Sequence, residues 1–160
     1  MPVRILIADD HEVVRQGIRT ILAARPEWEI CGEAVNGQEA VTLAGELNPD
    51  AVIMDITMPV MSGLEAARQL SKTQTSPPIL IFTMHESRSL ADSVKETGAR
   101  GFVFKSRAAR DLVQALEILL QGGTYFGSEA EKKQQAKKDG PNRGISFLSA
   151  LDFARKPDIA

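Results

Sequence analysis

The sequence predicts an α/β fold in which five parallel strands form one doubly wound sheet with helices on both faces. Short apolar runs recur along the first two thirds of the chain, and a segment with helical periodicity follows each of them. Strict alternation of strands and helices is typical of a parallel sheet that is covered on both faces. The expected strand order is 2-1-3-4-5, which is common for five-stranded sheets of this type.

The predicted strands are short, and four of the five are almost entirely apolar. Runs of this kind suit strands that are buried on both faces of a sheet. The second run, around Cys31, is weaker than the others. The five strands are predicted at residues 3–8, 29–35, 51–54, 79–82 and 101–104.

The predicted helices show apolar residues spaced three or four positions apart. The strongest stripe follows the fifth strand and contains Leu112, Leu116 and Leu119. Turn-forming residues stand where helices should end, because Gly, Asn and Pro interrupt helical patterns. Such signals occur at Asn48-Pro49 for the second helix and at Gly98 for the fourth.

Bulk properties exclude several classes of protein. The chain has 160 residues and a formal net charge of −2, so no global electrostatic attraction to nucleic acid or membrane is expected. A single Cys excludes an internal disulfide and argues against a Cys-based zinc site. We see neither a signal peptide nor an apolar run near the roughly 20 residues that span a bilayer, and we expect a cytoplasmic protein.

The composition divides the chain into a domain at residues 1–126 and a polar, lysine-rich tail at residues 127–160. Residues 1–127 hold 12 Lys and Arg against 16 Asp and Glu, so their net charge is −4. Residues 128–160 hold 7 against 5, which gives +2. A short helix near residues 146–154 is one interpretation of the apolar residues there, and an accidental apolar tail is the other.

Three carboxylates are predicted to meet at one edge of the sheet. Asp9 and Asp10 follow the first strand and Asp55 follows the third, and these two strands are neighbours in the expected order. Ligands of open α/β sheets bind beyond the carboxyl ends of the strands, where the strand order reverses. Clustered carboxylates repel one another and need a cation, and Mg²⁺ commonly binds carboxylates, waters and phosphate.

Two further polar residues leave the same edge of the sheet. Thr83 follows the fourth strand and Lys105 follows the fifth. A hydroxyl and an ammonium group beside a metal-bound carboxylate indicate a phosphoryl group as the missing ligand. Asp55 would then be a nucleophile that forms an aspartyl phosphate, while Mg²⁺ and Lys105 offset the charge on the transferred group.

These residues resemble the receiver domain of bacterial two-component response regulators, in the class related to the NarL and FixJ regulators. The resemblance covers residues 3–126 and implies a flavodoxin-like receiver fold. The matching elements occur in order and at matching spacing: Asp9-Asp10, Met54 to Pro59 with Gly63, Thr83, and Gly101 to Lys105.

The resemblance implies a role for each residue of the acidic cluster. Asp55 would accept a phosphoryl group from the phosphohistidine of a sensor histidine kinase or of a phosphotransfer protein. Asp10 and Asp55 would bind Mg²⁺ directly, together with the backbone carbonyl of Thr57. Asp9 would act mainly through a metal-bound water. His11 and His85 are expected to face solvent near the site and not to bind zinc.

The resemblance also implies a switch. Lys105 would pair with the phosphoryl group and Thr83 would hydrogen-bond to it. Movement of Thr83 would open space into which the ring of Phe102 turns. The switch would change the surface of the fourth helix, fifth strand and fifth helix, through which partners or a second copy usually dock. The protein is expected to be a signalling domain and not an enzyme.

Two hypotheses remain for what the switch controls. The related class normally continues into a helix-turn-helix domain of DNA-binding regulators, whereas only 33 residues follow Gly127 here, without its helix pattern. One hypothesis is a receiver that works by protein–protein contact, and the other is a truncated transcription regulator. We expect no specific DNA binding by this chain alone, because Lys and Arg that could neutralise phosphates are concentrated in the short tail.

Overall fold

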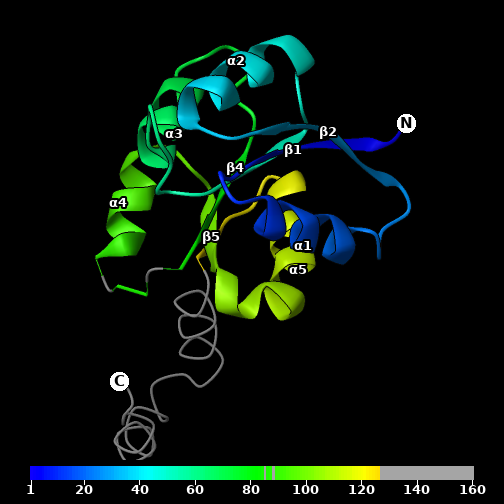
Figure 1. Ribbon diagram of the computed structural model, residues 1–160. Coiled ribbons are helices and arrows are strands. Elements are labelled where there is room, and N and C mark those ends of the chain that lie inside the picture. The colour runs from blue at the N-terminus through cyan, green and yellow to red at the C-terminus, as the bar shows by residue number, and fades with distance from the viewer. Residues whose placement is uncertain (85, 88, 127–160) are drawn as a thin grey trace, which may run out of the picture. The chain divides into compact units, whose positions relative to one another are not determined.

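The structure is a computed structural model that describes residues 1–84, 86–87 and 89–126 (Figure 1). The chain divides into two compact units, Met1–Gly127 and Ser128–Ala160, and the description below concerns the first. The predicted short helix near residues 146–154 lies outside the described residues. None of the helices in the described part of the chain has the length and hydrophobicity needed to span a bilayer.

Strands and helices alternate along the chain as the sequence predicts. The strands are β1 (Val3–Ala8), β2 (Trp28–Ala34), β3 (Ala51–Met54), β4 (Ile79–Thr83), β5 (Gly101–Phe104) and β6 (Tyr125–Phe126). The helices are α1 (Glu12–Leu22), α2 (Gly37–Leu47), α3 (Gly63–Ser71), α4 (Leu90–Glu96) and α5 (Ala108–Leu120), and a short 3-10 helix, η1 (Lys105–Arg107), precedes α5.

All strand pairs of the sheet are parallel, and the strand order is β2-β1-β3-β4-β5-β6. The predicted order of the first five strands is therefore confirmed, but the prediction of five strands is wrong. The sixth strand has two residues, too few to show any hydrophobic period. It can approach β5 because Gly101 has no side chain: a Cβ there would lie 1.9 Å from the carbonyl oxygen of Tyr125.

The two faces of the sheet carry separate apolar cores. In β1, Leu6 and Ala8 contribute to one core, whereas Ile5 and Ile7 contribute to the other. Helices α2, α3 and α4 cover the first face, and α1 and α5 cover the second, as Figure 1 shows. Both faces of the central strands are therefore buried, which explains why those strands are almost entirely apolar.

Turn residues end the helices where the sequence predicts. Asn48 takes the left-handed conformation after α2, with φ 47°, and Gly98 has φ 89° just after α4. Asn and Gly tolerate this conformation better than other residues. Side chains also fix two helix starts, because Asn36 and Ser62 accept hydrogen bonds from the third backbone N–H of α2 and of α3.

Candidate functional site

The carboxyl ends of β1 and β3 bring the three predicted carboxylates together. One ligating atom from each of Asp9, Asp10, Asp55 and His11 lies within 4.8 Å of the others. Asp9 and Asp55 are buried, whereas Asp10 and His11 are exposed. The cluster therefore has a buried floor and an open side, through which an ion or a small phosphodonor can enter.

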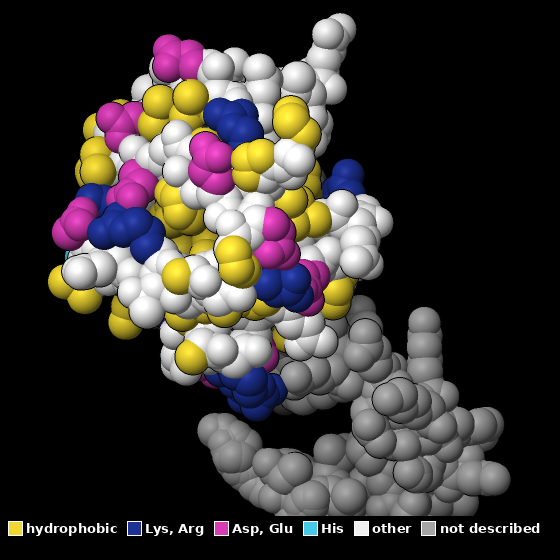
Figure 2. Space-filling model, turned by 90° about the vertical axis from the view of Figure 1, so that its right-hand side faces the viewer, with side chains coloured by type: hydrophobic (Ala, Val, Ile, Leu, Met, Phe, Trp, Pro, Cys, Tyr) yellow, Lys and Arg dark blue, Asp and Glu magenta, His cyan; other side chains and the backbone are white. Residues whose placement is uncertain are grey.

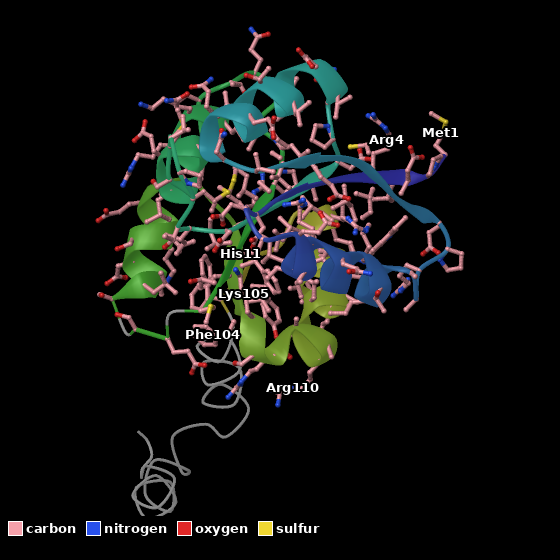
Figure 3. All side chains as sticks on the ribbon, viewed as in Figure 1. Met1, Arg4, His11, Phe104, Lys105 and Arg110 are labelled. Atoms are coloured by element: carbon pink, nitrogen blue, oxygen red, sulfur yellow. The ribbon has the colours of Figure 1, made fainter. Side chains whose placement is uncertain are left out.

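Lys105 brings a positive charge to the buried floor of the cluster. Its Nζ lies 2.8 Å from Oδ2 of Asp9 and 3.4 Å from Oδ1 of Asp55. Figure 3 shows Lys105 at the end of β5 and His11 at the start of α1, facing the same region. Lys105 therefore lies at the edge of the sheet where the sequence predicts it, and there it contacts both buried carboxylates.

The backbone around Asp55 is held tightly on both sides. Its N–H donates to the carbonyl of Ala8 at 2.9 Å, and the N–H of Ile56 donates to its carboxylate Oδ1 at 2.8 Å. The N–H of Gly63 donates to the carbonyl of Ile56 at 2.8 Å. A Cβ on Gly63 would lie 1.7 Å from the carbonyl oxygen of Asp55, so the loop closes only because residue 63 is a glycine. Thr57 lies in this loop, two residues after Asp55.

Asp9 is fixed by groups from α1. The backbone N–H of His11 donates to Oδ1 of Asp9 at 2.9 Å, and Nη1 of Arg15 donates to its backbone carbonyl at 2.7 Å. Arg15 is in turn paired with Glu33 of β2 at 2.7 Å and with Glu12. Sequence reasoning missed Arg15, because a lone arginine on an amphipathic helix usually faces solvent and carries no signal of a site.

The buried carboxylates fit a divalent cation. Oδ2 of Asp9 is fully buried and accepts no hydrogen bond from the described residues. Nζ of Lys105 lies 2.8 Å from that oxygen and 3.4 Å from Oδ1 of Asp55, so one lysine offsets only part of the negative charge of the three carboxylates. Carboxylate oxygens are preferred ligands of hard cations such as Mg²⁺. Asp10 and Asp55 would hold such an ion.

Burial raises the pKa of the Asp55 carboxyl, and the negative charge of Asp9 raises it further. Lys105 and the N–H of Ile56 oppose this rise. A carboxyl group whose pKa is higher in the folded than in the unfolded state makes its full contribution to the stability of the fold at pH values below its unfolded-state pKa. That stability is lost as the pH rises through the folded-state pKa. Above its folded-state pKa, the ionised Asp55 therefore destabilises the metal-free protein.

We expect Asp55→Asn to raise the free energy of unfolding in EDTA at neutral pH, on the order of 1 kcal/mol, because the change removes a desolvated charge. The difference from wild type should shrink as the pH falls through the folded-state pKa and vanish below the unfolded-state pKa. Urea unfolding at several pH values measures it. Glu96→Gln, which removes an exposed carboxylate at the end of α4, is the matched control and should change little. An Asp55→Asn protein less stable than wild type at neutral pH would contradict the expectation.

The two predicted switch residues belong to β4 and β5, the strands that follow β3 in the sheet. Thr83 is the last residue of β4 and is fully buried. Phe102 of β5 is also buried, and its ring centroid lies 5.3 Å from that of Phe104 and 5.9 Å from that of Phe126. The ring therefore already points into the protein, and it touches the last described residue of the chain.

A parallel sheet in this order with an acidic cluster and a lysine at its carboxyl edge defines a receiver domain. Residues 5–117 match the family model described as response regulator receiver domain, and the chain belongs to this family. It therefore carries the receiver of a two-component phosphorelay, as the sequence predicts.

Among its relatives, the chain is 37% identical over 124 residues to the transcriptional regulatory protein DegU of Brevibacillus brevis, covering 78% of this chain and 52% of DegU. It is 31% identical over 149 residues to the response regulator GacA of Pseudomonas aeruginosa, covering 93% of this chain and 70% of GacA. The chain thus spans about half to two thirds of the length of the first curated relatives it matches.

Solved structures show the same fold. The crystal structure of a LuxR-family two-component response regulator from Aurantimonas sp. SI85-9A1 has a TM-score of 0.74 and 34% identity, covering 94% of this chain and 98% of that chain. The signal receiver domain of the putative response regulator NarL from Mycobacterium tuberculosis has a TM-score of 0.72 and 26% identity, covering 76% of this chain and 98% of that one.

Proposed function

We propose that Asp55 is the phosphoacceptor of this receiver and takes its phosphoryl group from the phosphohistidine of a sensor histidine kinase or of a phosphotransfer protein. A carboxylate oxygen of Asp55 attacks phosphorus, and the bond from phosphorus to the histidine nitrogen breaks with its electron pair going to that nitrogen. The imidazole, protonated on its other nitrogen, leaves as the neutral base. The observation that carries the proposal is the position of Asp55: buried, at the carboxyl end of β3, 3.4 Å from Lys105 and clustered with Asp9 and Asp10.

Each residue around Asp55 has a proposed task in the transfer. Asp10, Asp55 and the backbone carbonyl of Thr57 would hold Mg²⁺, and Asp9 would act mainly through a water. The ion supplies positive charge beside the phosphoryl oxygens. Lys105 pairs with the same oxygens, which exchanges its contact with Asp55 for one with the transferred group. Since phosphoryl transfer depends mainly on alignment and charge, these positions suffice without a general base.

The proposed readout begins at Thr83 and ends at the surface. Thr83 hydrogen-bonds to the phosphoryl group, and Phe102 responds to the space that Thr83 leaves. Because the Phe102 ring contacts Phe126 and β5 pairs with β6, its movement is transmitted to β6 as well as to the face formed by α4, β5 and α5. That face is the proposed docking surface for partners or for a second copy of the chain. The proposed receiver domain is residues 1–126, and residues 127–160 form a tail.

The test of this function is the intact mass of the purified protein after incubation with acetyl phosphate and Mg²⁺. Wild type should gain the mass of one phosphoryl group, and EDTA should prevent the gain. Asp55→Asn should show none with Mg²⁺ present. A gain that survives EDTA or the substitution would contradict the proposed site, and so would its absence from wild type with both acetyl phosphate and a phosphorylated kinase as donor.

A second candidate function is sequence-specific DNA binding. The names of DegU, YdfI and LnrK describe transcriptional regulatory proteins, and the alignment with LnrK of Bacillus subtilis extends over 148 residues, beyond the receiver match. On the face shown in Figure 2, acidic and basic side chains of the described residues are interspersed. That face has no continuous basic stripe for a phosphate backbone.

We expect this chain to give no sequence-dependent shift of duplex DNA at nanomolar concentration and physiological salt, with or without phosphorylation. The reason is that residues 1–127 carry a net charge of −4, whereas non-specific affinity for DNA comes from Lys and Arg side chains that neutralise its phosphates. An electrophoretic mobility shift assay with random and genomic duplexes measures it. A sequence-selective shift would establish the DNA-binding function instead.

A further inference from the structure

The His11 side chain faces the acidic cluster although most of it is exposed. Its Nδ1 lies 3.2 Å from Oδ1 of Asp10 and 3.3 Å from Oδ1 of Asp9. The side chain is 65% exposed and its Nδ1 lies within hydrogen-bond distance of Oδ1 of Asp9, so polar attraction and not packing directs the ring toward the carboxylates. The sequence-based expectation that His11 faces solvent agrees with its exposure. The sequence also led us to expect no zinc binding by His11, and the direction of its ring nitrogen is the reason to depart from that expectation.

Helix α1 does not need this imidazole. His11 is the N-cap residue of α1, with φ −107° and ψ 117°, and its side chain makes no capping hydrogen bond. The local contact is made by its backbone N–H, which donates to Oδ1 of Asp9 at 2.9 Å. The ring can therefore serve another purpose, and its removal should leave the helix start intact.

The spacing of these atoms matches that of ligands around one metal ion. Neighbouring ligands of an octahedral ion bound at about 2.1 Å are about 3.0 Å apart. Around a tetrahedral ion with ligands at the same distance they are about 3.4 Å apart. The distance of 3.2 Å from Nδ1 to Oδ1 of Asp10, the nearer of the two proposed direct ligands, falls between these values. The ligating atoms of His11, Asp10 and Asp55 lie within 4.8 Å of one another, so a small side-chain movement brings them around one ion.

Lys105 and His11 approach Asp9 from different sides. Lys105 lies by Oδ2 and His11 lies by Oδ1. An ion bound on the His11 side therefore leaves Lys105 in place.

We propose that His11 supplies a nitrogen ligand to the divalent ion at this site, so that the site takes a transition-metal ion such as Co²⁺ or Zn²⁺ in addition to Mg²⁺. This inference rests on the metal site of the proposed function. Imidazole nitrogen suits Zn²⁺ and its neighbours in the first transition row, whereas Mg²⁺ prefers oxygen. His11 therefore adds affinity for the transition metals and very little for Mg²⁺.

The test is titration of the full chain with Co²⁺ followed by proton NMR, with Mg²⁺ titrations in parallel. The proteins are wild type, His11→Ala, and His85→Ala, which removes the other of the two histidines in the chain. Wild type should show hyperfine-shifted imidazole proton signals. His11→Ala should lose them and bind Co²⁺ at least about tenfold more weakly. His85→Ala should retain both the signals and the affinity, and all three proteins should bind Mg²⁺ alike.

The outcomes separate this inference from the proposed function. If His11→Ala keeps the signals or binds Co²⁺ as wild type does while Mg²⁺ still binds, the nitrogen ligand is overturned and the Mg²⁺ site stands. Loss of the signals in His85→Ala instead would show that His85 binds the Co²⁺, and it would also overturn the proposal that His11 is a ligand. If wild type binds neither ion, or Asp10→Asn binds both as well as wild type, the metal site of the proposed function itself fails.

Discussion

Lys105→Ala should slow phosphorylation by acetyl phosphate on the order of 100-fold, because it removes the positive charge that would stabilise the transferred phosphoryl oxygens. In the same variant the affinity for Mg²⁺ should rise. Lys105 Nζ lies 2.8 Å from Asp9 and 3.4 Å from Asp55, so it competes with the ion for the negative charge of the cluster. The rate is measured by intact mass at short times and the affinity by calorimetry.

The opposite signs of these two effects make the Lys105 experiment informative. General damage to the fold would lower both the rate and the affinity, whereas the proposed role lowers one and raises the other. Lys72→Ala, which removes an exposed lysine at the end of α3, is the matched control and should change neither. A rate within about twofold of wild type would show that Lys105 does not act on the phosphoryl group.

Gly63→Ala should lower the free energy of unfolding by about 3 kcal/mol, the upper part of the range for forcing atoms into a packed region. The new Cβ would lie 1.7 Å from the carbonyl oxygen of Asp55 and 2.9 Å from Cγ of Met54. Both neighbours belong to or follow β3 in the middle of the sheet, so the backbone that carries the phosphoacceptor must shift. Phosphorylation should fall with stability, because transfer requires alignment within a fraction of an ångström.

The control for Gly63→Ala is the same substitution in a helix with free space. A Cβ on Gly45 of α2 would have no neighbour within 4 Å. Gly45→Ala should therefore raise the free energy of unfolding, by about 0.5 to 1 kcal/mol, since Ala favours helix over Gly. Urea unfolding measures both variants. Equal stability of Gly63→Ala and wild type would refute the tight closure between Gly63 and Asp55.

Patterns in the sequence predict the main sheet because they repeat over many residues. Each central strand is buried on both faces, so its apolar run is continuous and recognisable. The meeting of Asp9 and Asp55 follows from topology alone, since neighbouring parallel strands end at one edge. The two-residue strand Tyr125–Phe126 could not be predicted, because it depends on the absence of a side chain at Gly101, which lies far away in sequence.

The finer geometry of the site was also beyond the sequence. Arg15 reaches the carbonyl of Asp9 because α1 packs beside β2, where Glu33 orients the guanidinium. The ring direction of His11 depends on a backbone conformation at the helix start that no spacing reveals. In both cases the residue type is common on helix surfaces, and only the tertiary contact distinguishes it.

The central claim is that Asp55 itself carries the phosphoryl group as an aspartyl phosphate. The most direct test is to phosphorylate the protein with acetyl phosphate and Mg²⁺, reduce it with borohydride, and sequence the peptides by mass spectrometry. Borohydride reduces an acyl phosphate to an alcohol, so the account predicts homoserine at position 55 and unchanged aspartate at positions 9 and 10. Homoserine at position 9 or 10, or a phosphoryl group that resists borohydride on another residue, would contradict it.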